Sequence, residues 1–510
     1  METHTEQISG IGIIADKWDA DHVKFRPYIN SIRIRPPKPI DRGYYYKLYK
    51  NTIPLIRYTL EENGFCESVN PKQQWLILWG VSTLKSKVYH SLTKYQKVNH
   101  FPRSIEITRK DCLCKNISKM ATIYGHHHFD FIPRTFILPQ ELHLLTEAFE
   151  KDPSKFWIIK PSDSSQGRGI LVTNDIADIP ENTQCIASKY ISNPLLIDGY
   201  KFDLRIYLVI TSINPLRLYV FEDGLARFAT CKYSPPMTSN KGNRYIHLTN
   251  YSVNKHNKDF LFNESSTKDG VGSKWSLKAL MKYLEECGIS SAMLWERIDE
   301  ILIKTILAIE PLIKSSCDMY VPYEGNCFEL LGFDILLDSA LTPWLLEVNL
   351  SPSLNCDSPL DQKIKGQLIA DLFTLIGVVP LEQHDYSDAG YNNLLKFTPI
   401  RKSQRWLKEK KPKNYIAAST PIKEQKTAIK ETNSEYRRRG RFRRIFPTIH
   451  YSYYKKFFET ERPLNIIIAD QLIKESPNGR RSQRKLVGKK ILEQLKASSA
   501  RILKLPYLNK

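Results

Sequence analysis

Hydrophobic residues recur with both helical and strand periods in the first part of the chain. The segment IPLIRYTLEENGF predicts a short amphipathic helix that ends at Gly64, and QWLILWGV predicts a buried strand. A further periodic segment, TRKDCLCKNISKMATIYG, predicts a helix that stops at Gly125. We therefore expect a small α/β domain over residues 41–150, after an N-terminal extension over residues 1–40.

Strand patterns are stronger over residues 151–380, where we expect a second and larger domain. Two periodic blocks, KWSLKALMKYLEECG and MLWERIDEILIKTILAIEPLI, predict helices, and DQKIKGQLIADLFTLIG predicts a helix that ends at Gly377. The polar block between residues 240 and 275 predicts a loop. The predicted strands are FWIIKP, GILVT, CIASKYI, FDLRIYLVIT, LRLYVFEDGLARFA, CFELLGFDILLD and PWLLEVNLSP. This mixture places the chain in the α/β (α+β) class.

The net charge of the chain comes from its C-terminal part. Residues 1–400 contain 45 Lys and Arg against 45 Asp and Glu, whereas residues 401–510 contain 30 against 9, so the last segment carries the whole net charge of +21. Within it, KKILEQLKASSARILKLP predicts a basic amphipathic helix. We expect residues 381–510 to form a basic, partly helical extension that contacts a polyanion: nucleic acid, acidic membrane or an acidic protein surface.

Other features narrow the class of protein. Nine cysteines scattered over 510 residues are too few for a disulfide scaffold. The first residues, METHTEQISG, lack the basic and apolar regions of a signal peptide, and no run of about 18 apolar residues predicts a membrane-spanning helix. We expect a cytosolic protein, or one attached to a cytosolic structure.

Two motifs have the composition of a nucleotide site. Lys160 begins KPSDSSQGRGI, a small-residue segment between two apolar runs, which predicts a β-hairpin whose backbone N–H groups can approach phosphate. The segment is not a Walker A loop, so the choice lies between an ATP-grasp hairpin and a plain turn. In KFDLR, Lys201, Asp203 and Arg205 share one strand face, which is costly unless they bind a ligand or pair in a solvated salt bridge.

A third motif has the composition of a magnesium site. Asp334 lies in the strand FDILLD, and Glu347 and Asn349 share one face of the strand LLEVN. On adjacent antiparallel strands these residues form a set of oxygen ligands, which suits Mg²⁺ that is also held by phosphates. The alternatives are a strand-end cap at Asp334 and a surface ion pair at Glu347. Arg227 and the segment HLTNYSVNK suit a zwitterionic small molecule, although singly they read as ordinary loop or core residues.

Six ordered motifs resemble those of the tubulin tyrosine ligase-like family. They are WIIKPSDSSQGRGI, YISNPLLI, KFDLRIYLVIT, HLTNYSVNK, CFELLGFDILLD and PWLLEVNLSPSL, and VNHFPRSIEITRKDCL is similar to the N-terminal part of the family core. The resemblance covers roughly residues 40–380, and RKDCL, YISNPLLI and NCFELLGFDIL resemble the polyglutamylase branch. It implies an ATP-grasp core that follows the small α/β domain and precedes the basic extension.

The resemblance implies a reaction that forms an isopeptide bond at the cost of ATP. With Mg²⁺, ATP phosphorylates the side-chain carboxylate of a glutamate in a tubulin C-terminal tail, and the amine of free L-glutamate attacks the acyl phosphate. The protein acts mainly by positioning and by neutralising charge. We expect a monomeric tubulin polyglutamylase in the cytoplasm and on the cytoskeleton, with the cilium, flagellum and basal body as further locations.

The resemblance also implies a role for individual residues. Arg205 faces the reacting carboxylate and phosphate, and it forms the implied catalytic set with Lys201 and Asp203. The implied ATP contacts are Lys160, Gln166, Gly167, Ser188, Lys189, Tyr190, Ile191, Lys201, Phe202, Asp203, Thr249 and Asn250. The implied glutamate contacts are Arg227, Tyr251, Ser252 and Lys274, and the implied magnesium ligands are Asp334, Glu347 and Asn349. Several glutamylases have Arg where this chain has Gln166.

Three other functions are open to a chain with these residues. A glycylase, or a glutamylase of a non-tubulin acidic protein, has the same core, but the two cations Arg227 and Lys274 suit the extra carboxylate of glutamate. A catalytically silent microtubule-binding protein does not need the complete set of oxygen ligands. A nucleic-acid-binding protein could use EYRRRGRFRR, but no nucleic-acid-binding motif accompanies this segment, so we do not expect that partner.

Overall fold

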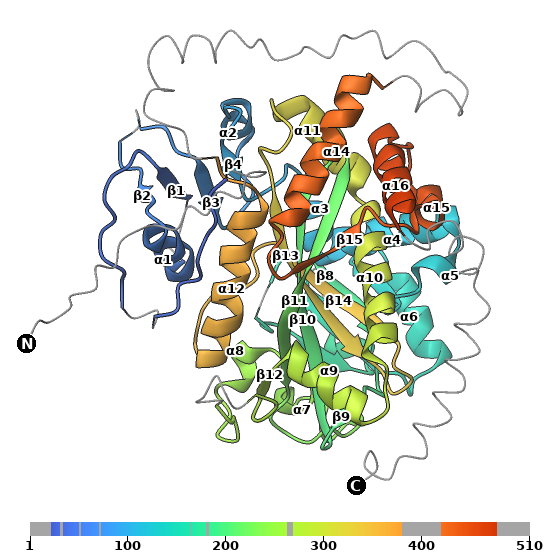
Figure 1. The fold of residues 1–510 in the computed structure, drawn as a ribbon. Helices are drawn as coiled ribbons and strands as arrows, with labels where there is room; N and C mark the ends of the chain where they lie inside the picture. The colour runs from blue at the N-terminus through green and yellow to red at the C-terminus, as the bar shows by residue number, and fades with distance from the viewer. Residues whose placement is uncertain are drawn as a thin grey trace, which may run out of the picture.

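The computed structural model describes residues 22–30, 34–49, 53–70, 73–164, 166–179, 183–262, 269–379 and 420–476. Helices and three sheets alternate in these residues, so the predicted mixed α/β class is confirmed (Figure 1). None of the helices in these ranges is long and apolar enough to cross a membrane.

The first sheet is parallel and lies at one side of the molecule (Figure 1). Its strands, in the order β2-β1-β3-β4, are β1 (Tyr45–Tyr49), β2 (Cys66–Glu67), β3 (Ile77–Gly80) and β4 (Lys97–Val98). The predicted amphipathic helix is α1 (Pro54–Glu62), and the predicted buried strand is β3. Four helices follow: α2 (Ser86–His90), α3 (Ile105–Thr108), α4 (Lys110–Tyr124) and α5 (His126–Phe129). The helix α4 stops at Gly125 as predicted, where a φ of 103° favours glycine.

The second sheet is antiparallel and has the order β5-β8-β6-β7. It consists of β5 (Thr135–Leu138), β6 (Trp157–Pro161), β7 (Leu171–Thr173) and β8 (Cys185–Lys189), and it is accompanied by α6 (Leu142–Lys151) and a 3-10 helix, η1 (Ile176–Asp178). The pair β6–β7 is the predicted glycine-rich hairpin. Because β5 lies before residue 150 and pairs with β8, this sheet takes strands from both sides of the predicted domain boundary.

The third sheet has seven strands and forms the centre of the molecule (Figure 1). The order is β12-β11-β10-β13-β14, with β9 on β10 and β15 on β11; the bounds are β9 (Leu196–Ile197), β10 (Tyr200–Ile213), β11 (Leu216–Phe228), β12 (Lys274–Ser276), β13 (Glu329–Leu337) and β14 (Pro343–Asn349). Alternate residues of β10 pack into two different clusters: Leu204 and Ile206 into one, Tyr207 and Val209 into the other. The long strands are therefore covered on both faces.

The helices after β11 differ from the prediction in three places. The polar block contains two short helices, α7 (Arg244–His247) and α8 (Tyr251–Asn254). The helix predicted from Lys274 begins only at Leu277, as α9 (Leu277–Glu286), because residues 274–276 pair with β11 as strand β12. The next predicted helix is two helices, α10 (Ser291–Leu307) and α11 (Glu310–Tyr320), and Pro311 at the start of α11 cannot continue the helix before it. The helix α12 (Pro359–Leu375) precedes Gly377 as predicted.

The described part of the C-terminal extension packs on the core. Its elements are α14 (Ile422–Arg437), β15 (Phe442–Phe446), α15 (Tyr451–Tyr454), the 3-10 helix η6 (Lys455–Phe457) and α16 (Pro463–Glu475). The strand β15 pairs antiparallel with β11, and Phe442 and Phe446 are buried. Asn465 is also buried, and its Oδ1 accepts a 2.8 Å hydrogen bond from Leu216 N. Residues 420–476 are therefore not a separate tail, whereas the predicted basic helix near the C-terminus lies outside the described residues.

Candidate functional site

A pocket lies between the second and third sheets. One wall comes from β6 and β8, with Lys160 and Ser188, and the other comes from β10, β13 and β14, with Lys201, Asp334 and Glu347. The predicted ATP-binding residues that line it are Lys160, Gln166, Gly167, Ser188, Lys189, Tyr190, Ile191, Lys201, Asp203, Thr249 and Asn250. The structure thus brings together residues that are almost a hundred positions apart in the sequence.

The glycine-rich loop forms one side of the pocket. Gln166 and Gly167 have φ angles of 63° and 73°, in the left-handed region. Ser252 Oγ donates to Gln166 O at 2.9 Å, and the Arg244 guanidinium donates to Gly167 O. A Cβ atom at Gly167 would lie 2.8 Å from Val253 Cγ2, so only glycine allows this approach. The glycine-rich loop therefore packs against the segment that contains α7 and α8.

Lys201 is buried beside the pocket, with 6% of its surface exposed. Its Nζ donates to Tyr190 Oη and to His247 O, both at 3.0 Å, and the Tyr190 hydroxyl lies 2.9 Å from His247 Nδ1. Burial, together with the nearby positive charge of Lys160, lowers the pKa of Lys201 to about 7. Burial also lowers the pKa of Lys160. Burial therefore disfavours the charge of both lysines, and an anionic ligand beside them would favour it.

The charges predicted on one face of β10 do lie together, and they are buried rather than solvated. Arg205 is opposite Asp334 in the strand register, and its Nε lies 2.6 Å from Asp334 Oδ1. Arg227 is opposite Asp203 and contacts both that carboxylate, at 2.5 Å, and Asp334, at 2.9 Å. Burial alone would raise the pKa of Asp334, but the two guanidinium groups hold it well below its usual range. Asp334 is therefore ionised.

The predicted magnesium ligands lie on paired strands. Asp334 is opposite Glu347, and Asn349 is opposite Gly332, in the antiparallel ladder of β13 and β14. Asn349 Nδ2 donates to Gly332 O at 3.2 Å, which leaves the amide oxygen available as a ligand. The described residues hold no cluster of three or more His, Cys, Asp and Glu side chains that suits a metal. The set contains two carboxylates and one amide, a composition that suits Mg²⁺.

Three of the predicted glutamate contacts lie next to one another. Arg227 is opposite Lys274 in the pairing of β11 with β12. Lys274 Nζ lies 4.1 Å from the centre of the Tyr251 ring and 2.6 Å from Asp361 Oδ2. Asp361 also pairs with Lys365, at 2.8 Å. The fourth predicted contact, Ser252, instead touches the glycine-rich loop.

Phe202 is the exception among the predicted ATP contacts. Its side chain is buried in the core, 5.4 Å from the ring centre of Phe228, so only its backbone can face a ligand. Sequence reasoning also missed Lys110, which lines the pocket. The Lys110 amine lies 3.6 Å from Glu347 and donates to Ser164 O at 2.7 Å. The segment RKDCL was interpreted only as part of a predicted helix and for its similarity to the family, and nothing in its spacing points to the pocket.

Comparisons with known proteins identify the family of this chain. A sequence model of the Tubulin-tyrosine ligase family matches residues 88–386, more than half of the chain. The chain is 39% identical over 477 residues to "Tubulin polyglutamylase TTLL5" of Mus musculus, covering 89% of this chain and 35% of that protein. It is 41% identical over 446 residues to "Tubulin monoglutamylase TTLL4" of Homo sapiens, covering 83% and 37%.

A third relative, "Tubulin polyglutamylase TTLL6" of Homo sapiens, is 36% identical over 413 residues, covering 80% of this chain and 44% of that protein. The chain thus spans less than half the length of each of these three relatives. The match to the family nevertheless includes both walls of the pocket and the strands that carry Asp334 and Glu347. The chain belongs to the tubulin-tyrosine ligase family.

Proposed function

We propose that this chain is an ATP-dependent ligase that joins L-glutamate to glutamate side chains of tubulin tails. The observation that carries the proposal is a row of charged side chains across neighbouring strands, which runs from Lys274 and Arg227 through Asp203 and Arg205 of β10 to Asp334 and Glu347. Several relatives are named as tubulin polyglutamylases, and one is named as a monoglutamylase. Two sheets facing each other across a pocket support an ATP-grasp core.

In this proposal the pocket holds ATP with its phosphates at the glycine-rich loop. Lys160 and Lys201 lie on opposite walls and neutralise phosphate charge, and Lys110 adds a cation next to Glu347. Asp334, Glu347 and the Asn349 amide oxygen would hold Mg²⁺. When bound there, the ion would neutralise charge on the phosphates and help to align them. These residues supply positioning and charge rather than a covalent intermediate on the protein.

The amino-acid substrate is placed at the other end of the row. Arg227 and Lys274 are adjacent cations, and a glutamate with two carboxylates can contact both. Glycine has a single carboxylate, so the second cation favours glutamate. Arg205 lies between this end and Asp334, where it can stabilise charge that develops on the acceptor carboxylate.

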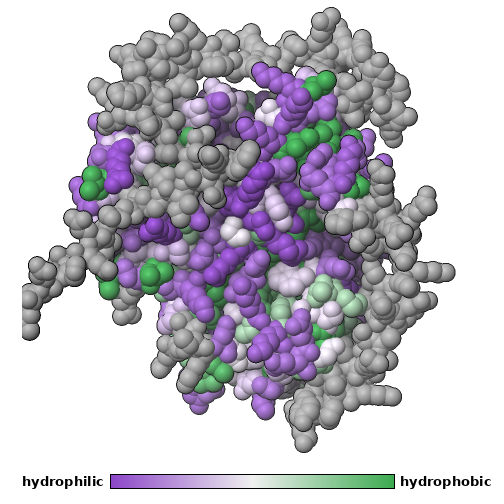
Figure 2. All heavy atoms as spheres, in the orientation of Figure 1, coloured by the Kyte–Doolittle hydropathy of each residue, from purple (hydrophilic) through white to green (hydrophobic). Residues whose placement is uncertain are grey.

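The basic extension is the proposed contact with the microtubule. Residues 401–419 and 477–510 together contain 17 Lys and Arg against 2 Asp and Glu, a net charge of +15. Hydrophilic residues also predominate on the face that carries α12 and α14 (Figure 2). Tubulin tails are acidic, so a cationic surface raises the rate of encounter. We therefore propose that the protein acts on the cytoskeleton, including the microtubules of cilia, flagella or basal bodies. We propose that it acts there as a monomer.

Mass spectrometry of a modified peptide tests the proposal. The purified chain is incubated with ATP, Mg²⁺, L-glutamate and a synthetic glutamate-rich tubulin tail. We expect the peptide to gain glutamate residues on side-chain carboxylates, and fragmentation locates the branch. An unmodified peptide, or glutamate joined only to the C-terminal carboxylate, contradicts the proposal.

A further inference from the structure

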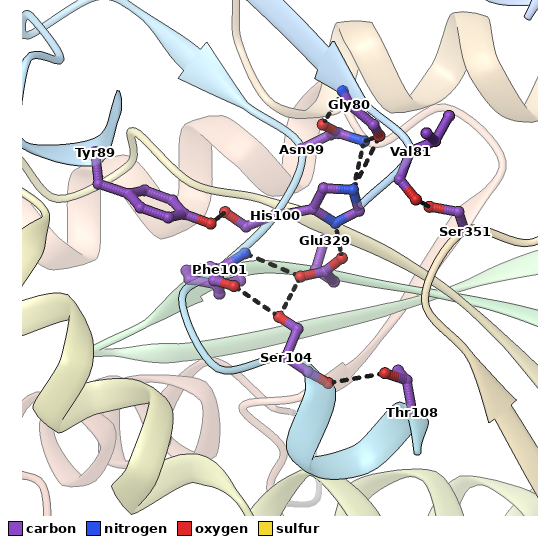
Figure 3. A network of polar contacts seen from close by, with 10 residues as sticks. All are labelled: Gly80, Val81, Tyr89, Asn99, His100, Phe101, Ser104, Thr108, Glu329 and Ser351. Carbon is purple, nitrogen blue, oxygen red and sulfur yellow. Dashed lines mark hydrogen bonds and ion pairs between the residues drawn. The ribbon is translucent and has the colours of Figure 1, made fainter. Parts of the chain in front are cut away.

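A buried carboxylate joins the first sheet to the central sheet. Glu329, at the start of β13, is only 1% exposed and faces the segment that follows β4 (Figure 3). Its Oε1 lies 2.6 Å from His100 Nδ1, and its Oε2 accepts hydrogen bonds from Phe101 N at 2.9 Å and Ser104 Oγ at 2.5 Å. A buried carboxylate is costly unless donors surround it, and here one short segment supplies three of them.

The same segment is also tied to the first sheet. His100 Nε2 lies 2.9 Å from Gly80 O, at the end of β3. The Asn99 side chain accepts from Gly80 N at 2.7 Å and donates to Gly80 O at 2.8 Å. Burial disfavours a charged imidazole at His100, but Glu329 outweighs this effect and raises the pKa of His100. The segment is therefore held between β3 and β13 on both sides.

These contacts lead to the pocket along the chain. Thr108 Oγ1 donates to Ser104 O at 3.3 Å, and α4 begins immediately afterwards with Lys110 (Figure 3). The Lys110 amine then reaches Ser164 O in the glycine-rich hairpin and approaches Glu347. On the other side, Ser351 Oγ donates to Val81 O at 3.1 Å, which ties the end of β14 to the loop after β3.

We propose that Glu329 is a positioning residue, whose buried contacts with residues 100–104 hold the start of α4 so that Lys110 reaches the pocket. Glu329 lies on the face of β13 that carries Leu331 and Phe333, opposite to Asp334, so it acts through Lys110 and does not touch the ligand. This inference rests on the proposed function, because that function places ATP beside Lys110.

A double-variant cycle tests the link between the two residues. Glu329→Gln keeps the size of the side chain and removes its charge, and Lys110→Met removes the amine. We measure the Kd for ATP by calorimetry and kcat for glutamate ligation, each per folded protein. Each single variant should weaken ATP binding by about fivefold or more, and the double variant should be within about twofold of Lys110→Met alone. If the losses of ATP affinity in the two single variants multiply in the double variant, the proposal is overturned. An unchanged Kd for ATP in Glu329→Gln would also overturn it.

Two further variants separate positioning from stability. Glu310→Gln is a matched control, because Glu310 is also fully buried and pairs with Arg462 at 2.8 Å, away from the pocket lining. It should lower Tm and leave the Kd for ATP unchanged; a weaker Kd in this control means that destabilisation alone explains the effect. If Glu329→Gln does not fold, Ser104→Ala removes one donor only and should show a smaller loss with the same dependence on Lys110.

The two proposals can fail separately. A chain that binds ATP but ligates no glutamate rejects the proposed function, and the Kd cycle still decides the role of Glu329. A chain that binds no ATP rejects the positioning role as well, because Lys110 would then have no ligand to contact.

Discussion

The protonation of the buried lysines depends on whether an anionic ligand binds in the pocket. Burial and the nearby charge of Lys160 lower the pKa of Lys201 to about 7. Bound triphosphate favours the charge again, so the pKa of Lys201 rises on binding. Protons are then taken up when ATP binds above pH 7, and affinity falls as the pH rises from the free pKa toward the bound one.

Calorimetry of ATP binding at pH 8, in buffers of different ionisation enthalpy, measures this uptake. We expect an uptake that approaches one proton from Lys201. Lys201→Arg keeps the charge without titrating, so it should bind ATP with less proton uptake. Equal uptake in the variant and the wild type would assign the proton to another group.

The proposed metal ligands give a second prediction. Glu347→Gln replaces an anionic oxygen donor with a neutral amide of the same size, so the fold should survive and the affinity for Mg²⁺ should drop. Loss of an outer-shell partner alone costs about 10–100-fold in metal affinity or activity, so we expect a larger loss here. Ligation rates measured over a range of Mg²⁺ concentrations check this, and near-normal turnover at ordinary Mg²⁺ would exclude Glu347 as a ligand.

Lys274 offers a cleaner test of amino-acid binding than Arg227. Arg227 also holds Asp203 and Asp334, so its removal disturbs the metal site. In Lys274→Met, Asp361 keeps its ion pair with Lys365. We expect the KM for glutamate to rise at least about tenfold while the KM for ATP stays within about twofold, since one charge-assisted contact is lost. If the KM for glutamate and the KM for ATP rise in parallel, Lys274 is not a contact of the glutamate substrate.

Much of the pocket lining could be predicted from strand periodicity and motif order. Side chains two positions apart share a strand face, so Lys201, Asp203 and Arg205 were correctly placed together. Lys110 could not be found in this way, because it comes from the helix α4, and only the tertiary structure brings its amine to Ser164 and Glu347. The pairing of Asp334 with two arginines depends on strand register, which the sequence alone does not reveal.

At the scale of elements, the long central strands were predicted and the short edge strand β15 was not. Its sequence, FRRIF, has two adjacent arginines and no strict alternation, and a five-residue pattern of this kind is also typical of a basic surface segment. Two helices were merged in the prediction because apolar residues recur across the break between α10 and α11. Local periodicity does not report how the chain turns at Pro311.

Truncation tests the role of β15 and the helices around it. A chain ending at residue 476 should keep the thermal midpoint of the full chain. A chain ending at residue 419 leaves part of β11 without its strand partner and removes Phe442 and Phe446, so we expect it to aggregate. Phe442→Ala in the full chain should cost about 3–5 kcal/mol of unfolding free energy. Thermal and denaturant unfolding of the two shortened chains and of Phe442→Ala check these expectations. A stable chain ending at residue 419 would show that the elements after it are dispensable for folding.

At the scale of the whole molecule, the proposed encounter with a microtubule depends on the uneven charge of the chain. Residues 477–510 alone contain 10 Lys and Arg against 1 Glu, and removing them spares the folded segment 420–476. Attraction between surfaces is screened by salt, with a Debye length of about 10 Å at 0.1 M and about 3 Å at 1 M. Deletion should therefore weaken co-sedimentation with microtubules at low salt and make little difference at high salt.

The same deletion should leave ligation of a free tail peptide nearly unchanged, because it keeps the described residues that line the pocket. The comparison measures, for the full and the shortened chain, the kinetics of ligation to the peptide and the co-sedimentation with microtubules. Equal losses on peptide and on microtubules would indicate that the segment contributes to catalysis, and unchanged sedimentation would reject its role as a tether.

In the proposed function, the pocket between the two sheets binds ATP, and the row of side chains from Lys274 to Glu347 holds a metal and glutamate for transfer to tubulin. The most direct measurement is the incorporation of radiolabelled amino acids into purified microtubules, with and without ATP and Mg²⁺. We predict that glutamate is incorporated, that glycine and tyrosine are not, and that omission of ATP or the Glu347→Gln substitution abolishes incorporation. Preferential incorporation of glycine or tyrosine, or incorporation of glutamate without ATP, would contradict the account.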